Sequence, residues 1–342
     1  MSAPLAPFRV KEWRGVTREI FRDRIMPANQ PAVLKGLVAD WPAVVAAKTS
    51  DETIAEYLAR MDAGKPVTIL TGGPEIGGRF FYTESMDGLN FRRQPTRLIE
   101  ALKGLLAFRS SAEPPALAVQ SIPTEGALPG FAAANPQPLL EDALAAPRIW
   151  LGNAIVTATH FDMNYNIACA VAGRRRFTLF PPEQLKNLYL GPLEFTPAGP
   201  PVSLVDIAKP DLARFPKFQE ALASAQSAEL EPGDAIYIPY FWFHNVESLD
   251  RFTVLVNYWW NEPRTVMGRP LEALLHALAS LGGLSAEERR IWREVFDHYV
   301  FQVHGDPVAH IPPERRGSLG EMTPEHLARV RQILIAALGG RP

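Results

Sequence analysis

The middle of the chain alternates between apolar and polar residues in short runs, and each run ends at a turn signal. A repeat of two residues is typical of strands that bury one face. Pro181-Pro182 and Pro232-Gly233-Asp234 are two of these turn signals. Regularly spaced short strands indicate a sandwich or barrel, and we expect a double-stranded β-helix, or jelly roll. The expected strands are residues 116–120, 149–151, 154–161, 167–172, 175–180, 235–238, 243–247 and 252–260.

The two ends of the chain follow the longer period of helices. Towards the N-terminus we expect strands at 31–36 and 66–71, helices over 18–25 and 98–106, and a capping box from Thr49 to Glu52 that opens a further helix. Beyond residue 262 the apolar spacing predicts three helices, and a short one is expected near 139–144. The fold prediction is therefore mainly β with flanking helices. Its parts are an α/β region (1–115) packed on a β core (116–262), and a helical extension (263–342).

Composition limits the class of protein without identifying it. Hydrophobic residues make up 47% of the 342 positions, which is enough for a sizeable core. A net charge of −2 gives no bulk attraction to nucleic acid or to an anionic membrane. No apolar run approaches the roughly 18 residues that a membrane span needs. The single cysteine, Cys169, cannot form an internal disulfide, and no secretory signal is visible, so we expect a cytoplasmic protein.

A candidate metal site comes from the distribution of the histidines. Of seven, only His160 and His244 lie before residue 270, and both sit in strand-like sequence. Asp162 is two residues after His160, so a strand would place both side chains on one face. Two imidazoles and one carboxylate suit a non-haem Fe(II) centre with open positions. Two hydrogen-bonded core histidines are the alternative, and the five histidines of the helical tail are expected to be solvated or to cap helices.

A candidate anion site lies on the neighbouring strands. Alternation places Arg175 on the same face as Phe177, so an inward-facing Arg175 would be a buried cation in need of an anion. A carboxylate matches the guanidinium fork. The alternatives are pairing with a protein acid or a solvated run of three arginines. Three polar side chains on the predicted walls could converge on the same pocket: Thr157, Asn166 and Asn257.

These residues stand in motifs that resemble those of the Jumonji-C, cupin-like 2-oxoglutarate oxygenases. The motifs are Thr157-x-x-His160-x-Asp162-x-x-x-Asn166, Gly173-Arg174-Arg175-Arg176-Phe177, Tyr237-Ile238-Pro239-x-x-Trp242-x-His244 and Val256-Asn257-Tyr258-Trp259. The resemblance covers about residues 15–262. Among the members of this family, the chain most resembles the asparaginyl hydroxylase that acts on hypoxia-inducible factor.

The resemblance implies a role for each site residue. His160, Asp162 and His244 would bind Fe(II). Thr157 and Arg175 would hold the distal carboxylate of the co-substrate 2-oxoglutarate, and Asn166 and Asn257 would contact its metal-proximal end. Two co-substrate atoms and O2 would fill the open metal positions, so that a C–H bond is hydroxylated with release of succinate and CO2. A tyrosine that also grips the co-substrate in the hydroxylase falls near Ala118 here. The aromatic residues expected to wall the pocket are Tyr237, Tyr240, Phe241, Trp242, Phe243 and Trp259.

Other functions remain open from the sequence. A cupin that binds zinc or manganese and acts as an isomerase or hydrolase would use the same ligands. A Jumonji-C demethylase and a non-catalytic interaction protein that keeps the fold are further options. By analogy with the hydroxylase, we expect a homodimer formed through the C-terminal helices. The substrate itself, whether protein, peptide or small molecule, is not identified.

Overall fold

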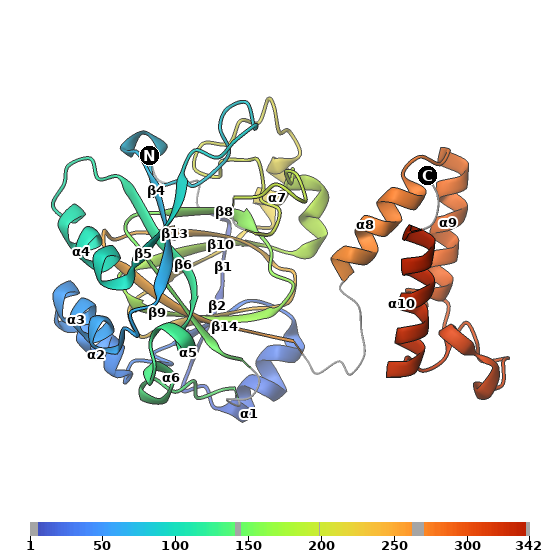
Figure 1. Ribbon diagram of the computed structural model, residues 1–342, viewed down its shortest axis with the longest axis horizontal. Helices are drawn as coiled ribbons and strands as arrows, with labels where there is room; N and C mark the ends of the chain where they lie inside the picture. The colour runs from blue at the N-terminus through green and yellow to red at the C-terminus, as the bar shows by residue number, and fades with distance from the viewer. Residues whose placement is uncertain (1–5, 141–144, 198, 262–269, 340–342) are drawn as a thin grey trace. The chain divides into compact units, whose positions relative to one another are not determined.

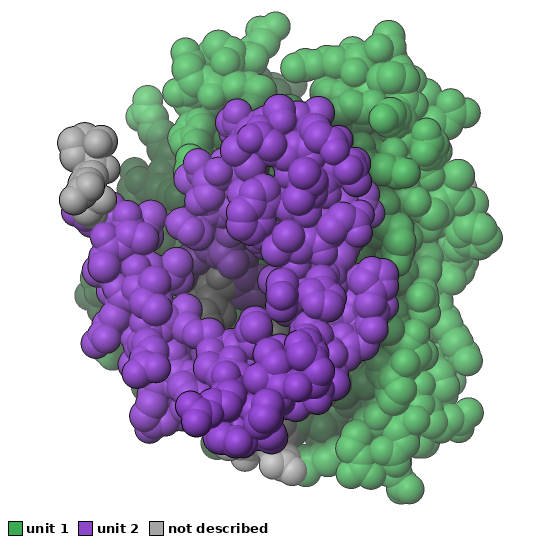
Figure 2. Space-filling model, turned by 90° about the vertical axis from the view of Figure 1, so that its right-hand side faces the viewer, with its two compact units in different colours: residues 1–261 green, residues 262–342 purple. Residues whose placement is uncertain are grey.

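A computed structural model describes residues 6–140, 145–197, 199–261 and 270–339. The chain divides into two compact units, residues 1–261 and residues 262–342 (Figure 2). All the described strands belong to the first unit, and the second contains helices and their connections. The three-part domain organisation stays a prediction, and most of the helix expected near 139–144 lies outside the described residues.

Two sheets form the first unit. The smaller has five strands in the order β1-β11-β10-β13-β8, and the larger has nine in the order β2-β3-β12-β9-β14-β7-β6-β4-β5. This architecture agrees with the predicted jelly-roll core with flanking helices. The strands are β1 Phe8–Arg9, β2 Lys11–Arg14, β3 Ala32–Lys35, β4 Pro66–Gly72, β5 Arg92–Arg97, β6 Ala116–Pro123, β7 Pro147–Gly152, β8 Val156–His160, β9 Tyr165–Ala172, β10 Arg175–Phe180, β11 Gln226–Leu230, β12 Ala235–Ile238, β13 Phe243–Ser248 and β14 Thr253–Trp260.

The central strand β9 shows how the two faces of the large sheet differ. Ile167, Cys169 and Val171 belong to a cluster shared with the helices that cover the outer face of this sheet (Figure 1). Ala168 and Ala170 alternate with them and face the strands of the smaller sheet. Because these inward residues are small, they leave room between the two sheets.

Ten α-helices are described, and most of the predicted ones are confirmed. They are α1 Arg18–Ile20, α2 Pro42–Thr49, α3 Asp51–Met61, α4 Leu98–Phe108, α5 Thr124–Ala127, α6 Phe131–Ala134, α7 Phe218–Ala223, α8 Pro270–Leu281, α9 Ala286–Tyr299 and α10 Pro324–Gly339. A π-helical turn, Phe21–Ile25, continues α1. No helix among the described residues is long and apolar enough to cross a membrane.

The predicted capping box at Thr49 is wrong by one position. Helix α2 continues through Thr49, whose hydroxyl donates to the carbonyl of Val45. Ser50 is the extended residue that caps α3, and it accepts from the backbone N–H of Thr53. Glu52 instead pairs with a distant arginine of α4's C-terminal end. The prediction assumed a loop before a single helix. In the structure α2 ends at Thr49 and α3 begins at Asp51, so only Ser50 between them is extended and can cap α3.

A tight turn between β9 and β10 sets the register of the strand that carries Arg175. Gly173 has φ +65, and a Cβ there would lie 2.6 Å from the carbonyl oxygen of Phe252. Glycine is the residue that adopts this conformation without steric cost. The turn therefore fixes which residues of β10 face the inside of the jelly roll.

Candidate metal centre

The two strand histidines lie directly opposite each other. His160 ends β8, and His244 is its partner in the antiparallel pair with β13. Their ring centroids are 4.3 Å apart. A bulge follows His244, since the register shifts before Val246. Bulges commonly redirect a side chain beside an active site, and here the shift occurs at a candidate ligand.

Each imidazole has one nitrogen fixed by the backbone. His160 Nδ1 lies 2.8 Å from the carbonyl oxygen of Ala158, and His244 Nδ1 lies 3.0 Å from that of Trp242. A carbonyl oxygen only accepts, so each Nδ1 donates, and in a neutral ring the other nitrogen, Nε2, keeps its lone pair. Burial holds the pKa of His244 well below its usual value, and the adjacent His160 lowers it further. Neutral imidazoles with a free Nε2 are the form that binds a metal.

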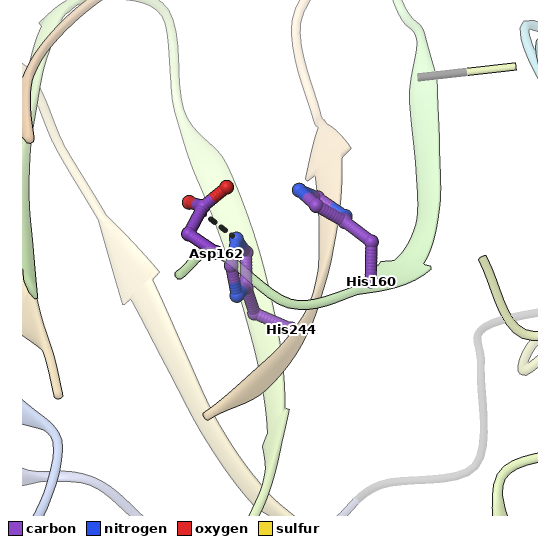
Figure 3. A group of neighbouring side chains, drawn as sticks. All are labelled: His160, Asp162 and His244. Atoms are coloured by element: carbon purple, nitrogen blue, oxygen red, sulfur yellow. Dashed lines mark ion pairs between the residues drawn. The ribbon is translucent and has the colours of Figure 1, made fainter. Parts of the chain in front are cut away.

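Asp162 completes the group from the connection that follows β8. Ligand atoms of His160, Asp162 and His244 all lie within 4.8 Å of one another (Figure 3). Asp162 Oδ2 is 3.6 Å from His244 Nε2. The donor set of two imidazoles and one carboxylate therefore fits a divalent transition metal such as Fe(II), and it also fits Zn²⁺.

All seven predicted site residues line one small cavity. Its volume is about 100 Å³. Typical pockets for drug-sized ligands are roughly 300–1,000 Å³, so this cavity suits a compact ligand. The lining residues are Gln120, Trp150, Thr157, His160, Asp162, Asn166, Ala168, Arg175, Phe177, Pro200, His244, Val246, Leu255, Asn257 and Trp259.

Arg175 is a buried cation in this cavity, 5% exposed. Its Nη2 donates to the Thr253 hydroxyl at 3.1 Å, while its Nε has no partner. No described carboxylate pairs with it, and burial alone lowers its pKa to about 10. Its two neighbours differ, because Arg174 pairs with Asp250 and Arg176 pairs with two glutamates. The inward position predicted from alternation is confirmed, and the guanidinium lacks an acidic partner within the described chain.

The amides of the cavity wall are oriented by a chain of hydrogen bonds. Trp150 Nε1 donates to Asn257 Oδ1 at 2.7 Å, and Asn257 Nδ2 donates to Asn166 Oδ1 at 3.3 Å. Asn166 Nδ2 then donates to Asp162 Oδ2 at 3.3 Å. Each asparagine uses one of its two amide N–H groups within this chain, so one N–H of each is left for a ligand.

Sequence reasoning missed several lining residues, among them Gln120, Trp150 and Pro200. Gln120 reaches the cavity beside an irregularity in the pairing of β6 with β7, where Ser121 has φ +56. A bulge does not follow the two-residue alternation, so it could not be predicted from the pattern. Trp150 stands in a predicted strand, but nothing in the neighbouring sequence indicates that its side chain faces the polar cavity. Pro200 comes from the long loop before α7, where the sequence has no periodicity.

The predicted aromatic wall is mostly wrong. Of the six residues proposed, only Trp259 lines the cavity. Tyr237 packs in the cluster under the outer helices, Trp242 lies in the apolar cluster between the sheets, and Phe243 packs against residues of the loop before α7. Ala118 is fully buried but does not line the cavity. Tyr237 lies near the end of one strand, Trp242 lies in the connection and Phe243 begins the next strand, so these aromatic residues point into three different clusters and do not share one wall.

The loop that supplies Pro200 is tied to the rest of the unit on both sides. Val202 forms a β-bridge with His160, and the Ser203 N–H donates to the carbonyl of Thr159 at 2.7 Å. Tyr82 donates from its hydroxyl to the carbonyl of Phe195 at 2.7 Å. The loop is thus held against the edge of β8, next to a candidate metal ligand.

Comparison with known proteins gives one family and several relatives. A family model described as a cupin-like domain matches residues 17–265. Lysine-specific demethylase JMJ31 of Arabidopsis thaliana is 35% identical over 119 residues, which are 34% of this chain and 21% of that protein. tRNA wybutosine-synthesizing protein 5 of Mus musculus is 28% identical over 308 residues, 82% of this chain and 91% of that protein. HSPB1-associated protein 1 of Bos taurus is 28% identical over 271 residues, covering 73% and 52%. The match spans only about a fifth of the Arabidopsis protein and about half of the bovine one.

Proposed function

Because the chain belongs to the family of cupin-like domains, we propose that it is an Fe(II)- and 2-oxoglutarate-dependent oxygenase that hydroxylates a C–H bond. One observation carries the proposal: the buried guanidinium of Arg175, with no acidic partner among the described residues, shares a small cavity with three metal-ligand side chains. A buried cation without a protein anion favours an anionic ligand. A compact dicarboxylic acid meets both requirements, since one end can bind the cation and the other the metal.

Each residue has a distinct task in this proposal. His160, Asp162 and His244 would hold the metal. Arg175 and Thr157 would bind the far carboxylate, and the remaining N–H groups of Asn166 and Asn257 would face the near one. Bound Fe(II), with 2-oxoglutarate and O2, supplies oxidative decarboxylation and oxygen insertion. The protein binds and orients these groups and keeps bulk water out of a largely buried site.

Succinate release tests the proposal. Purified protein supplied with Fe(II) and 2-oxoglutarate is expected to form succinate, and His160→Ala is expected to form none. His276→Ala, on the exposed helix α8, is the matched control and is expected to behave as wild type. Equal succinate formation by His160→Ala would refute the proposal. Tight zinc after anaerobic purification, with no response to 2-oxoglutarate, would favour the isomerase or hydrolase alternative instead.

Mass spectrometry of candidate substrates distinguishes the reactions that remain. The resemblance to the asparaginyl hydroxylase ranks hydroxylation first, which predicts a product that gains one oxygen. The relative named lysine-specific demethylase suggests methylated lysine peptides for the same screen, where the product would lose a methyl group. The relative named tRNA wybutosine-synthesizing protein adds tRNA to the candidates.

We also propose a homodimer formed through the C-terminal helices, as the analogy predicts. No residue of α8, α9 or α10 is buried within the chain. Large apolar side chains remain exposed there, among them Leu278, Trp292, Ile335 and Leu338. Light scattering at micromolar concentration is expected to give twice the chain mass, and Ile335→Lys with Leu338→Lys is expected to give a monomer. A monomeric wild type would contradict this proposal.

A further inference from the structure

Asp162 receives two hydrogen bonds on the same oxygen. Trp259 Nε1 donates to Asp162 Oδ2 at 2.9 Å, and Asn166 Nδ2 donates to it at 3.3 Å. An indole N–H can only donate, so this contact can form with the carboxylate whether or not a metal is bound. Two donors that reach one oxygen from different strands resist rotation of the carboxylate about its Cβ–Cγ bond.

The orientation of the second donor is itself fixed. The Asn166 amide could be turned either way if it were isolated, and its oxygen would then repel the carboxylate. Asn257 prevents this, since its Nδ2 donates to Asn166 Oδ1, and its own oxygen accepts from Trp150. The chain of hydrogen bonds thus begins at the indole N–H of Trp150 and ends on Asp162 Oδ2. The indole N–H of Trp259 donates to the same oxygen. The two indole rings pack edge to face, 5.8 Å apart.

We propose that Trp259 is a positioning residue that orients Asp162 towards the metal and thereby sets the metal affinity, with Asn166 as the second donor. The inference rests on the proposed function, because it takes His160, Asp162 and His244 as the metal ligands. Neither Trp259 nor its indole N–H touches the metal in this role. Second-layer contacts of this kind are worth about 10–100-fold in metal affinity.

The effect can be measured with metal alone. Apo-protein is titrated with Zn²⁺ in competition with a chromophoric chelator, and with Co²⁺ while its ligand-field absorption is recorded. Trp259→Phe keeps the ring and removes the N–H, and we expect about 10–100-fold weaker binding and a changed Co²⁺ spectrum, since the freed carboxylate can rotate. Trp41→Phe is the control, because it removes a buried indole N–H that donates to the carbonyl of Pro136 and lies outside the cavity and the hydrogen-bond chain. We expect its affinity to stay within about threefold of wild type.

A double-mutant cycle with Asn166→Ala separates positioning from general disruption. Both donors act on one oxygen, so the losses of Trp259→Phe and Asn166→Ala are expected to be non-additive. Thermal unfolding of each apo-protein establishes that the variants fold. If Trp259→Phe fails to fold, Asn166→Ala still tests the hydrogen bonds to the same oxygen of Asp162. If Trp259→Phe binds Zn²⁺ as wild type does, or if both tryptophan variants weaken equally without a spectral change, the inference is wrong. His160→Ala distinguishes this from failure of the proposed function, because wild-type affinity in that variant would mean that the metal site itself is misassigned.

Discussion

Replacing Arg175 by methionine is expected to stabilise the ligand-free protein while abolishing its response to 2-oxoglutarate. Burial lowers the pKa of Arg175 from its usual value to about 10. At 1.36 kcal/mol for each pKa unit, the charged form is about 3 kcal/mol less favourable in the folded protein than in water. The cost is fully present below about pH 10 and disappears only as the pH rises to the usual pKa of a guanidinium, so it applies throughout the neutral range. One hydrogen bond to Thr253 offsets about 1 kcal/mol of it.

Urea unfolding measures the stability of the ligand-free protein, and its repetition with 2-oxoglutarate measures the stabilisation by the ligand. We expect the free energy of unfolding of ligand-free Arg175→Met to rise by about 1–3 kcal/mol, which is comparable with the gain of about 1–4 kcal/mol found when buried ion pairs are replaced by well-packed apolar residues. With Zn²⁺ as a redox-inert metal, 2-oxoglutarate at a hundred times its Kd is expected to stabilise the wild type by about 2.7 kcal/mol. The variant is expected to show no such gain.

Arg176→Met is the matched control for this experiment. It lies next in the chain but pairs with Glu229 and Glu247. Its loss is expected to leave the stabilisation by 2-oxoglutarate unchanged. A loss of several kcal/mol in ligand-free Arg175→Met would refute the reasoning, because it would mean that a protein acid already compensates the guanidinium. Undiminished stabilisation of the variant by 2-oxoglutarate would refute the assigned role of Arg175.

Three further outcomes follow from the fold. Gly173→Ala is expected to lower the free energy of unfolding by about 2–4 kcal/mol in urea titrations, since its Cβ would strike a carbonyl oxygen. Gly15→Ala is the control, because Gly15 also has a positive φ (+58) but no atom within 4 Å of the added Cβ, and it is expected to cost about 1 kcal/mol. Burial raises the pKa of the Cys169 thiol, so the native protein is expected to resist a thiol reagent at pH 8 and react stoichiometrically in urea; rapid native labelling would contradict this. Asp234→Asn is expected to cost about 1–3 kcal/mol in thermal or urea unfolding, because it removes the charge that pairs with Lys35; an unchanged midpoint would contradict it.

The sequence predicts the members of the candidate site and the buried strands, but it does not predict the short and polar edge strands. Two-residue alternation places Arg175 inside the jelly roll, and the His160–Asp162 spacing with a distant His244 identifies the candidate ligands. The inward position of Arg175 is confirmed because β10 is buried along most of its length and keeps the two-residue alternation; the ligand roles of the three side chains stay a prediction. The short strands β1 and β2 and the polar edge strand β5 are missed, since an arginine-rich run containing Pro95 lacks the apolar alternation that marks a buried strand.

The remaining misses have other physical causes. Gln120 enters the cavity through a bulge, and a bulge depends on cross-strand pairing that no local pattern encodes. The hydrogen-bond chain that ends on Asp162 joins Trp150, Asn166 and Trp259, which come from three different strands. The direction of donation along it depends on the three-dimensional arrangement of donors and acceptors, so the sequence could suggest the two asparagines as polar wall residues but not the chain that joins them.

Most residues that line the cavity come from strands, and few come from loops. This difference bears on how related proteins can diversify. Apart from Asp162 and Pro200, every lining residue stands on a strand of the two sheets. Pro200 belongs to a loop that is held at Phe195, whose carbonyl accepts from Tyr82, and at Val202 and Ser203, which pair with β8. A change of sequence at Pro200 therefore alters the entrance of the cavity while the strand residues that carry the candidate metal and anion sites are inherited intact.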